Sequence, residues 1–204
     1  MSEGFKRRTP SRLGEGAALK EEILRAAARL LTETGREQDL SLRAVAREVG
    51  IAAPSIYLHF KDRAELVEEL TRRAFGRLVA ELRAAWEEEE EAAGPRAALG
   101  AMAHRYCRFA WDNPKIYRLM FGIERIEGSR DQAASHPLWT VHQLWVEKVA
   151  VCRADRSGHE EDERLAKLLW SALHGLVGLA MAVPFPADQR NLAQLVDDYL
   201  DLML

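Results

Sequence analysis

Two short helical segments on either side of a glycine, Leu42–Val49 and about Ile51–Leu58, constrain the fold of this chain more than any other feature. The first segment follows Ser41, a favourable N-cap residue, and it ends at Gly50, because only glycine adopts a left-handed backbone cheaply. Pro54 falls in the first turn of the second segment, where its missing N–H costs nothing. A helix, a tight glycine turn and a second short helix form the plan of a helix-turn-helix.

The rest of the chain has the pattern of amphipathic helices. Apolar residues recur at spacings of three and four, without any strong strand pattern. Ala, Leu, Glu, Arg and Lys make up 109 of the 204 residues, whereas Gly and Pro contribute only 13 and 7. Further helices are expected over residues 18–34, 63–86, 95–112, 114–121, 137–153, 160–182 and 188–203. The chain is therefore predicted to be all-α, with about nine helices.

Local signals set several of these boundaries. Gly35 is a helix stop, and Asp62 can cap the long helix that follows the helix-turn-helix. The acidic run Glu87–Glu91 precedes Gly94-Pro95 and is interpreted as a solvated helix end and connector. Pro95 is expected to open the next helix.

Several protein classes are excluded by composition. The two cysteines, Cys107 and Cys152, cannot form a disulfide framework and are expected to be free thiols in a reducing cytoplasm. No apolar run reaches the roughly 18 residues needed to span a bilayer. The polar, basic N-terminus lacks a following apolar stretch, which argues against a secretory signal. We therefore expect a cytoplasmic protein without a membrane partner.

Charge is divided unevenly along the chain. Residues 1–61 carry 11 Lys and Arg against 8 Asp and Glu, whereas residues 62–204 carry 18 against 24. A basic N-terminal part (residues 1–61, the head) followed by an acidic remainder is a charge distribution that a DNA-binding protein could use. The first residues, which include Lys6, Arg7 and Arg8, either form a basic arm that contacts DNA or a solvated tail.

The segment from Ser41 to Leu66 resembles the DNA-binding segment of the TetR family of bacterial repressors. The matching features are the Ala46-x-x-x-Gly50 turn and the Tyr57-x-His59-Phe60 close of the second helix, together with Leu66. The remainder resembles a TetR-type ligand-binding domain. Its Asn113-Pro114…Tyr117-Arg118-Leu119-Met120-Phe121 and Trp170-x-x-x-His174-Gly175 motifs resemble one common subtype of that domain.

This resemblance implies an organisation and a function. It implies a basic flexible arm over residues 1–16, a three-helix helix-turn-helix DNA-binding domain over 17–61, and a helical bundle over 62–204 for effector binding and dimerisation. The implied function is sequence-specific transcriptional regulation, as a repressor released from a palindromic double-stranded DNA operator by a small-molecule effector. No cofactor, metal or catalytic residue is implied.

The candidate DNA-binding residues lie on both short helices and just after them. They are Ser41, Arg43, Ala52, Ala53, Pro54, Ser55, Tyr57, His59 and Lys61. Small side chains at the start of the second helix allow it to enter the major groove, and their methyl groups can meet a thymine methyl. By resemblance, Tyr57 and His59 contact phosphates, while Phe60 packs inward. The chain departs from the family at Ala53, where a basic residue is common, and at Arg63, where Lys is common.

Structural roles can also explain these residues. Tyr57 could be a core aromatic with an exposed hydroxyl, His59 a capping or core histidine, and Ser41 an N-cap only. Arg47 is interpreted as a solvated or intrahelical partner rather than a DNA contact. Lys61 can neutralise a phosphate, and Arg43 can reach a phosphate or a base edge.

Two apolar stripes near the C-terminus favour a homodimer. The candidate interface residues are Leu169, Leu173, Leu176, Val177, Leu192, Leu195, Val196 and Tyr199. Gly175 and Gly178 would permit close helix approach. By resemblance, the two helices form half of a four-helix interface, and a dimer would place two heads roughly 34–36 Å apart on DNA. The alternative is that the stripes only close the protomer's own core.

An effector pocket is predicted from aromatic enrichment outside the head. Its candidate residues are Trp86, Tyr106, Phe109, Trp111, Met120, Phe121, Trp139, His142, Trp145 and His174. A lipophilic or aromatic effector would suit such a lining. The same residues could equally be ordinary core aromatics.

Two rival functions remain open from the sequence. One is a DNA-binding or partner-binding helical protein that responds to no effector. The other is an all-helical enzyme, for which His104, Cys107 and the acidic cluster after His159 are the candidate groups. Neither group has a recognised metal-ligand spacing, and no nucleophile elbow or phosphate-binding glycine loop is present.

Overall fold

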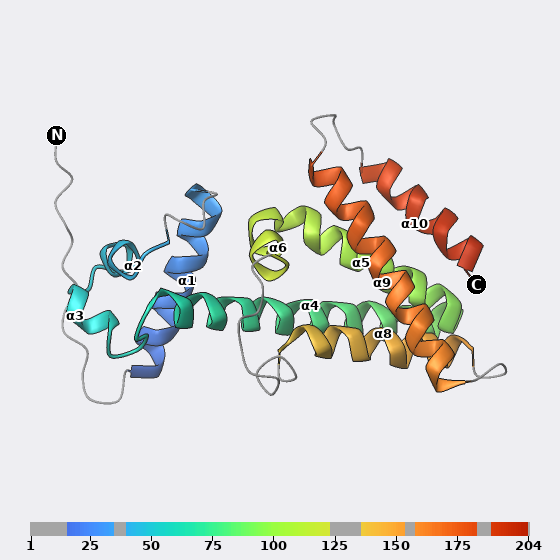
Figure 1. The fold of residues 1–204 in the computed structure, drawn as a ribbon, viewed down its shortest axis with the longest axis horizontal. Helices are drawn as coiled ribbons and strands as arrows, with labels where there is room; N and C mark the ends of the chain where they lie inside the picture. The colour runs from blue at the N-terminus through green and yellow to red at the C-terminus, as the bar shows by residue number, and fades with distance from the viewer. Residues whose placement is uncertain (1–15, 35–39, 123–135, 154–157, 183–188, 204) are drawn as a thin grey trace. The chain divides into compact units, whose positions relative to one another are not determined.

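The computed structural model describes residues 16–34, 40–122, 136–153, 158–182 and 189–203, and its regular structure is entirely α-helical (Figure 1). The all-α prediction is confirmed, with nine helices in these ranges. They are α1 (Gly16–Thr34), α2 (Leu42–Val49), α3 (Ala53–Ile56), α4 (Arg63–Ala93), α5 (Pro95–Asp112), α6 (Pro114–Met120), α8 (Leu138–Cys152), α9 (His159–Ala182) and α10 (Gln189–Met203).

The chain forms two compact units. Unit 1 consists of Met1–Ala74 and Arg118–Phe121, and unit 2 consists of Phe75–Tyr117 and Gly122–Leu204. Helices α4 and α6 therefore each begin in one unit and end in the other. The chain passes between the units after Ala74 and after Tyr117, both within a helix, and returns to unit 2 after Phe121.

The caps predicted for the helix-turn-helix are confirmed. The hydroxyl of Ser41 accepts a hydrogen bond from the backbone N–H of Ala44 at 3.1 Å. Gly50 has φ 79°, in the left-handed region, and its N–H is donated back to the carbonyls of the last turn of α2. Because a side chain is strained at this φ, glycine fixes the direction in which the chain leaves α2.

Helix α3 is shorter than the sequence predicted. Its α-helical part ends at Ile56 rather than near Leu58, although Pro54 lies in its first turn as expected. The next residues form tighter turns, in which the N–H of Leu58 is donated to Ser55 and that of His59 to Ile56. These i→i+3 bonds change the direction of the side chains that follow.

Helix α4 is longer than predicted, because it continues through the acidic run Glu87–Glu91 to Ala93. Glutamate is a good helix former, and Glu90 accepts a 2.6 Å hydrogen bond from the indole N–H of Trp86, so the run is part of the helix rather than a connector. The helix ends at Gly94, with φ 87°. At its other end, Asp62 caps α4 by accepting the N–H of Glu65 at 2.9 Å, as predicted.

The remaining helices begin and end within two residues of their predicted positions. Gly16 belongs to α1 rather than to the predicted arm. The other residues of that arm lie outside the described residues, as do Gly35, Asp188 and most of the segment expected to be a loop after Phe121. Cys107 and Cys152 are both free thiols.

In the core of unit 1, helices α1, α2 and α3 pack against the first turns of α4. Ile23, Val45, Ile56 and Leu66 have no exposed surface, and partly buried residues, among them Leu119 from the end of α6, pack against this cluster. Burial of such side chains supplies the main free energy that holds the short helices together, since segments of this length are unstable alone.

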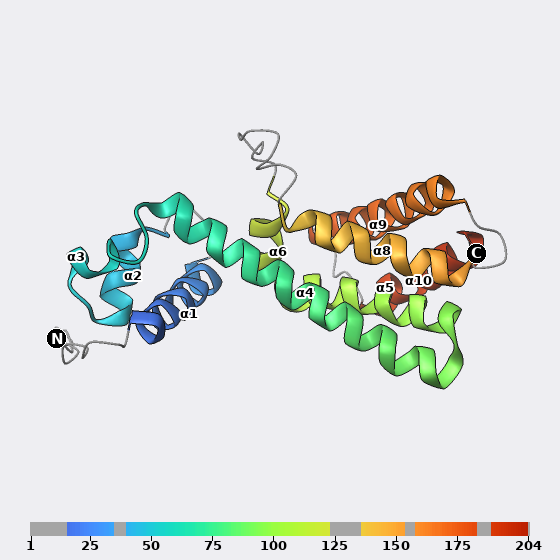
Figure 2. The same cartoon turned by 90° about the horizontal axis from the view of Figure 1, so that it is seen from below.

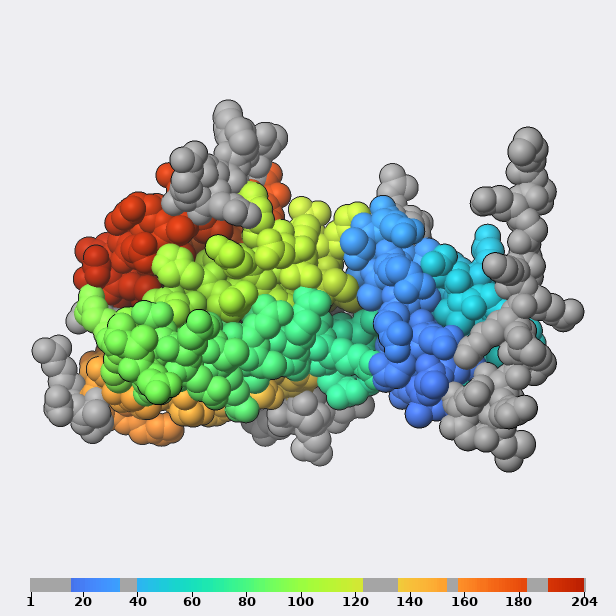
Figure 3. Space-filling view, turned by 180° about the vertical axis from the view of Figure 1, so that it is seen from behind, coloured from blue at the N-terminus to red at the C-terminus, as the bar shows by residue number. Residues whose placement is uncertain are grey.

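In unit 2, α5 packs against α8, α9 and α10, and α8 lies alongside α9 (Figures 1 and 2). In the space-filling view α10 forms part of the outer surface of this unit beside α5 (Figure 3). Helix α9 is long and apolar enough, by length and composition alone, to cross a bilayer, and only 22% of its most apolar stretch is buried. Polar residues such as Ser171 and His174 interrupt this stretch, so the prediction that no uninterrupted apolar run reaches about 18 residues still holds.

Candidate nucleic-acid interface

The start of α3 forms an exposed surface of unit 1. Ala52, Ala53 and Pro54 are exposed, and Ser55 is half-buried. These small side chains leave the helix end free to approach another molecule closely. Tyr57 follows on the same segment with half of its surface exposed, so it is not a core aromatic.

Basic side chains flank this surface. Arg43 and Arg47 are exposed on α2, and Lys61 is exposed just before α4. Ser41 is exposed as well, and its hydroxyl is occupied in capping α2. Arg63, by contrast, is half-buried and donates from Nε to the carbonyl of Leu40 at 3.0 Å, which ties the start of α4 to the segment before α2.

His59 and Phe60 turn toward the core of the head. Phe60 is 1% exposed, as predicted, and the Lys20 ammonium lies 5.4 Å from the centre of its ring. His59 is half-buried near the start of α1, where its ring lies 3.9 Å from the position that a Cβ on Gly16 would take. Only part of the His59 ring is therefore available to a ligand.

Leu58 was missed by the sequence analysis. It is 84% exposed beside Tyr57, which is unusual for a large apolar residue of a small domain. The predicted helix continued through this position, so the exposure of Leu58 was not foreseen. The tighter turns after Ile56 direct its side chain outward. The run of apolar residues around Ile56 gave no signal of this change.

Charged contacts fix α1 against α4 within unit 1. The two terminal nitrogens of Arg73 donate to the two carboxylate oxygens of Glu21, each at 2.6 Å, and its Nε donates to Glu69 at 2.8 Å. The hydrogen bond from Arg73 lowers the pKa of Glu21, and both carboxylates raise the pKa of Arg73 further above its usual value. Burial acts to raise the pKa of Glu69, but hydrogen bonds from Arg72 and Arg73 outweigh it and lower that pKa.

The residues predicted for the effector pocket do not form a single group. Met120 and Phe121 belong to unit 1, whereas the others belong to unit 2. Trp86 and Phe109 are buried, and their ring faces are covered by the cations of Lys148 and Arg77, both at 4.8 Å. Their faces are therefore occupied by the protein itself.

Five other candidates, with Tyr117 and Trp170 added, form an aromatic cluster between α5, α6, α8 and α9. Ring contacts form two groups in it, one of Tyr106, Tyr117, Trp145 and His174 and one of Trp139, His142 and Trp170. A side-chain hydrogen bond between Tyr106 and Trp170 joins the two groups. The remaining candidate, Trp111, is half-buried. Tyr117 and Trp170 belong to the aromatic enrichment outside the head but were not among the predicted pocket residues, because spacing along the chain could not show that they lie beside them.

Hydrogen bonds link three members of the aromatic cluster. The Tyr117 hydroxyl lies 2.5 Å from Nδ1 of His174 and 2.8 Å from the Tyr106 hydroxyl, which is itself 3.3 Å from the same nitrogen. Burial raises the pKa of both tyrosines and lowers that of His174. The hydroxyls therefore stay protonated and the imidazole neutral, which allows Tyr117 to donate to His174.

Within the described residues, the buried polar atoms of this cluster that lack a hydrogen-bond partner include Nδ1 of His142, which is 5% exposed, and the indole nitrogen of Trp145, which is fully buried. Leaving a buried polar group unpaired costs about 1–3 kcal/mol, so most buried groups in proteins are paired.

The structure buries some residues of the predicted dimer interface and exposes others. Five of its residues are buried inside the protomer, where they cannot touch a partner: Leu169, Leu173, Val177, Leu192 and Val196. Leu176 and Tyr199 are half-buried, and Leu195 is 47% exposed. The large apolar residues that do face outward on α9 and α10 also include Leu168, Leu179 and Leu202, at 53%, 66% and 87% exposure.

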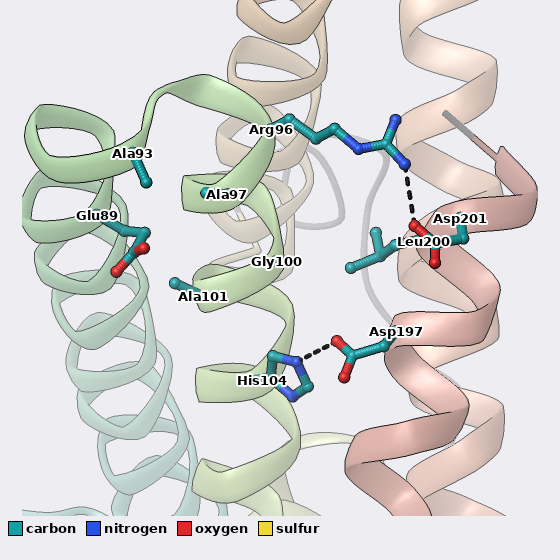
Figure 4. Close-up of a pocket in the computed structure, with 10 residues that line it drawn as sticks. All are labelled: Glu89, Ala93, Arg96, Ala97, Gly100, Ala101, His104, Asp197, Leu200 and Asp201. Carbon is teal, nitrogen blue, oxygen red and sulfur yellow. Dashed lines mark hydrogen bonds and ion pairs between the residues drawn. The ribbon is translucent and has the colours of Figure 1, made fainter.

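A separate groove of about 690 Å³ lies in unit 2 between the α4–α5 hairpin and α10 (Figure 4). Arg96 pairs with Asp201 at 3.1 Å and His104 with Asp197 at 2.6 Å across it. Ala93, Ala97, Gly100 and Ala101 form the small-residue side of the groove. None of the residues predicted for the effector pocket lines it.

The groups that suggested an enzyme are buried or paired with other side chains of the protomer. Burial raises the pKa of the Cys107 thiol to about 12, so it stays protonated. His104 on the same helix pairs with Asp197 instead. The acidic cluster forms the first turn of α9, and Asp162 there lies 3.6 Å from Arg153. Within the described residues, no three His, Cys, Asp or Glu side chains could hold a metal ion.

Comparison with known proteins identifies both parts of the chain. Residues 23–70 match the family model of bacterial regulatory proteins of the tetR family, and residues 99–203 match the tetracyclin repressor-like C-terminal domain. The second match alone covers half of the sequence. This chain belongs to the tetR family of bacterial regulatory proteins. The helix-turn-helix surface described above lies inside the first match, and the aromatic cluster lies inside the second.

Individual relatives agree with this membership. An uncharacterized HTH-type transcriptional regulator from Haemophilus influenzae is 41% identical over 64 residues, which span 31% of this chain and only 34% of that relative. A protein of unknown function from Rhodococcus sp. RHA1 is 27% identical with a TM-score of 0.75, covering 95% and 97% of the two chains. A TetR-family regulator from Streptomyces coelicolor is 23% identical with a TM-score of 0.67, covering 92% and 96%, and shares the fold.

Proposed function

We propose that this tetR-family protein is a sequence-specific DNA-binding repressor that a small-molecule effector releases from its operator. The observation that carries the proposal is the exposed start of α3, presented beyond the left-handed turn at Gly50. A recognition helix needs such a surface, because only small or polar side chains allow its N-terminal end to reach base edges.

The residues around α3 fit the two parts of DNA recognition. Ala52, Ala53 and Pro54 are the groups for base edges, with thymine methyls as their apolar partners. Tyr57 and Lys61 are exposed beside them, and we assign them to phosphates, which position the protein without reading sequence. Arg43, at the start of α2, and the exposed part of His59 complete the proposed surface.

A homodimer would use the outward faces of α9 and α10. Leu168, Gly175 and Leu179 follow one another at spacings of seven and four, so they share a face of α9. A Cβ on Gly175 or Gly178 would meet nothing within 4 Å, which leaves room for a second helix. Contiguous exposed apolar residues favour an interface, and a homodimer is typical of the family. A partner rather than lipid would then cover the apolar stretch of α9, as expected for a cytoplasmic protein.

Effector binding in unit 2 would release DNA by linkage. A ligand that binds one arrangement of the dimer more tightly shifts the population toward it, and a few kcal/mol of differential affinity are sufficient. Trp170 and His174, which form the Trp-x-x-x-His-Gly motif with Gly175, contribute to the aromatic cluster, so we assign this domain to the subtype that carries the motif.

Selection of bound fragments from bacterial genomic DNA tests this function. Purified full-length protein should enrich a short palindromic sequence, and its affinity for that sequence should exceed non-specific affinity by at least roughly 10³-fold. Affinity should fall steeply with salt concentration, because phosphate contacts release counterions. Equal affinity for all duplexes, or none for any, would refute the proposal.

A further inference from the structure

We infer that the aromatic cluster binds a neutral, largely apolar molecule that carries a hydrogen-bond acceptor such as a carbonyl oxygen. This inference rests on the proposed function, since it names the chemical class of effector. It also assigns the unpaired indole N–H of Trp145 as the group that holds the acceptor.

The two unpaired atoms lie on one face of α8. His142 and Trp145 are three residues apart and both are more than nine-tenths buried. Neither Nδ1 of His142 nor the indole nitrogen of Trp145 has a hydrogen-bond partner in the described structure. An indole nitrogen only donates, so the group missing beside Trp145 must be an acceptor. The neighbouring rings offer an apolar surface, since Tyr106 lies edge-on to Trp145 at 6.2 Å.

The aromatic cluster reaches solvent at three of its members. Trp139 is 47% exposed, and Trp170 and His174 are half-buried. The ring centre of Trp139 lies 5.8 Å from that of His142 in an edge-on arrangement, and the ring centre of Trp170 lies 6.3 Å from the same imidazole. We take these partly exposed rings as the route by which a small ligand would approach the unpaired atoms.

The surroundings exclude a charged effector. The hydrogen-bonded trio contains two protonated hydroxyls and a neutral imidazole, which carry no net charge. Within the described residues of unit 2, the cations that contact aromatic rings lie over Trp86 and Phe109, outside this cluster. A buried carboxylate without a counter-charge is strongly disfavoured, whereas a carbonyl oxygen needs only a donor.

Helix α6 gives this site a covalent route to the head. Tyr117 belongs to unit 2 and to the hydrogen-bonded trio, and the next residues, Arg118–Phe121, belong to unit 1. Leu119 packs there against the core that holds the helix-turn-helix. A ligand that changes the position of Tyr117 therefore acts on a helix whose other end is part of the DNA-binding unit.

Isothermal titration calorimetry of the full-length protein with three matched probes tests the inference. Acetophenone is neutral and carries a carbonyl, benzoate carries a charge, and ethylbenzene lacks an acceptor. Acetophenone should bind roughly tenfold more tightly than either of the others, a difference that one good hydrogen bond supplies. Tighter binding of benzoate, equal binding of ethylbenzene, or no binding of acetophenone at millimolar concentration would overturn the inference.

A tryptophan variant locates the interaction. Trp145→Phe removes the indole N–H and keeps an aromatic ring, so it should abolish the preference for acetophenone over ethylbenzene. Trp86→Phe is the matched control, since Trp86 is equally buried but donates to Glu90 outside the cluster. Circular dichroism checks that both variants fold. If both lose the preference to the same extent, packing rather than the N–H is responsible and the assignment fails.

Two further readouts separate the inference from the proposed function. The carbonyl stretching band of ¹³C-labelled acetophenone should lie at lower wavenumber when bound to the wild type than to Trp145→Phe. This result supports the site without any variant of the DNA-binding surface. If acetophenone binds in this way and leaves operator affinity unchanged, the ligand site stands and release by such an effector fails. If no operator exists, the proposed function fails on its own evidence.

Discussion

Arg73 on α4 donates hydrogen bonds to Glu21 on α1 from both terminal nitrogens of its guanidinium, each 2.6 Å from a carboxylate oxygen. The two residues are 52 positions apart in the chain, and both belong to unit 1. Because two parallel hydrogen bonds fix orientation as well as distance, this pair holds the first helix of the head against the helix that leaves it.

Removal of this pair should loosen the head in a pH-dependent way. The pKa of Glu21 is lowered from 4.5 in the folded state, so its stabilising effect is complete above that value and is lost as pH falls through the lower, folded pKa. Glu21→Gln should therefore lower the melting temperature near neutral pH, and the difference from wild type should vanish in strong acid. Calorimetry of both proteins checks this, with Glu163→Gln on the exposed face of α9 as control.

Arg73→Lys should retain only part of the thermal stability that Arg73 provides, because an ammonium cannot form two parallel hydrogen bonds. Its melting temperature is expected between those of the wild type and Arg73→Ala. A lysine variant as stable as the wild type would show that charge alone, and not the paired geometry, matters at this position.

Two glycine substitutions should change the free energy of unfolding in opposite directions. Gly50→Ala places a side chain at φ 79° and should destabilise the protein by roughly 1–2 kcal/mol. Gly76→Ala lies within α4, where an added Cβ meets nothing within 4 Å, and should stabilise by about 0.5–1 kcal/mol. Chemical denaturation measures both, and a neutral Gly50→Ala would contradict the turn described here.

Lys61→Ala should weaken binding to operator and to non-specific DNA alike. If Lys61 neutralises one phosphate, its loss should reduce the slope of log affinity against log salt by about one. Arg83→Ala removes the same charge from an exposed position of unit 2 and should leave the slope unchanged. Fluorescence anisotropy over a salt series distinguishes the two. Equal slopes for all three proteins would remove Lys61 from the interface.

A charged residue on the outward face of α9 should separate the proposed dimer. Leu179→Glu changes a 66% exposed side chain, so the protomer should stay folded while its mass in solution falls to that of a monomer. Val151→Glu, on an exposed position of α8, is the control and should remain dimeric. Analytical ultracentrifugation gives the masses. An unchanged mass for Leu179→Glu, or a monomeric wild type, would contradict the proposed interface.

His174 should make the fold sensitive to mild acid. Burial lowers its pKa below 6.5, so the unfolded chain takes up the proton first as pH falls. The stabilising effect of neutral His174 is therefore present above 6.5 and is lost as pH falls through the folded pKa. Wild-type melting temperature should fall over this range, and His174→Asn should show a weaker fall. An equal fall in the two proteins would contradict this role of His174.

The helix boundaries that the sequence predicted well are those set by neighbours along the chain. Ser41, Gly50 and Asp62 each act on backbone groups within one helical turn, so their roles could be recognised without any tertiary contact. The errors arose where two local signals competed. The prediction of a connector at the acidic run after Trp86 was wrong, because glutamates propagate a helix until Gly94 ends it.

The candidate sites show where such reasoning stops. The sequence identified the apolar residues of α9 but not which of them are buried. Leu169 is fully buried, whereas its neighbour Leu168 is 53% exposed. A single helical position separates the two, and the rotation of the helix against α8 decides which one faces outward.

The sequence by itself determined the helical content, the capped turn before α3 and the family to which the chain belongs, because these depend on residues close together in the chain. Only the tertiary structure decided that Tyr106, Tyr117 and His174 meet, although up to 68 positions separate them. It also decided that Trp145 is left with an unpaired N–H. Such contacts depend on how helices rotate and pack against one another, and no short-range pattern encodes that geometry.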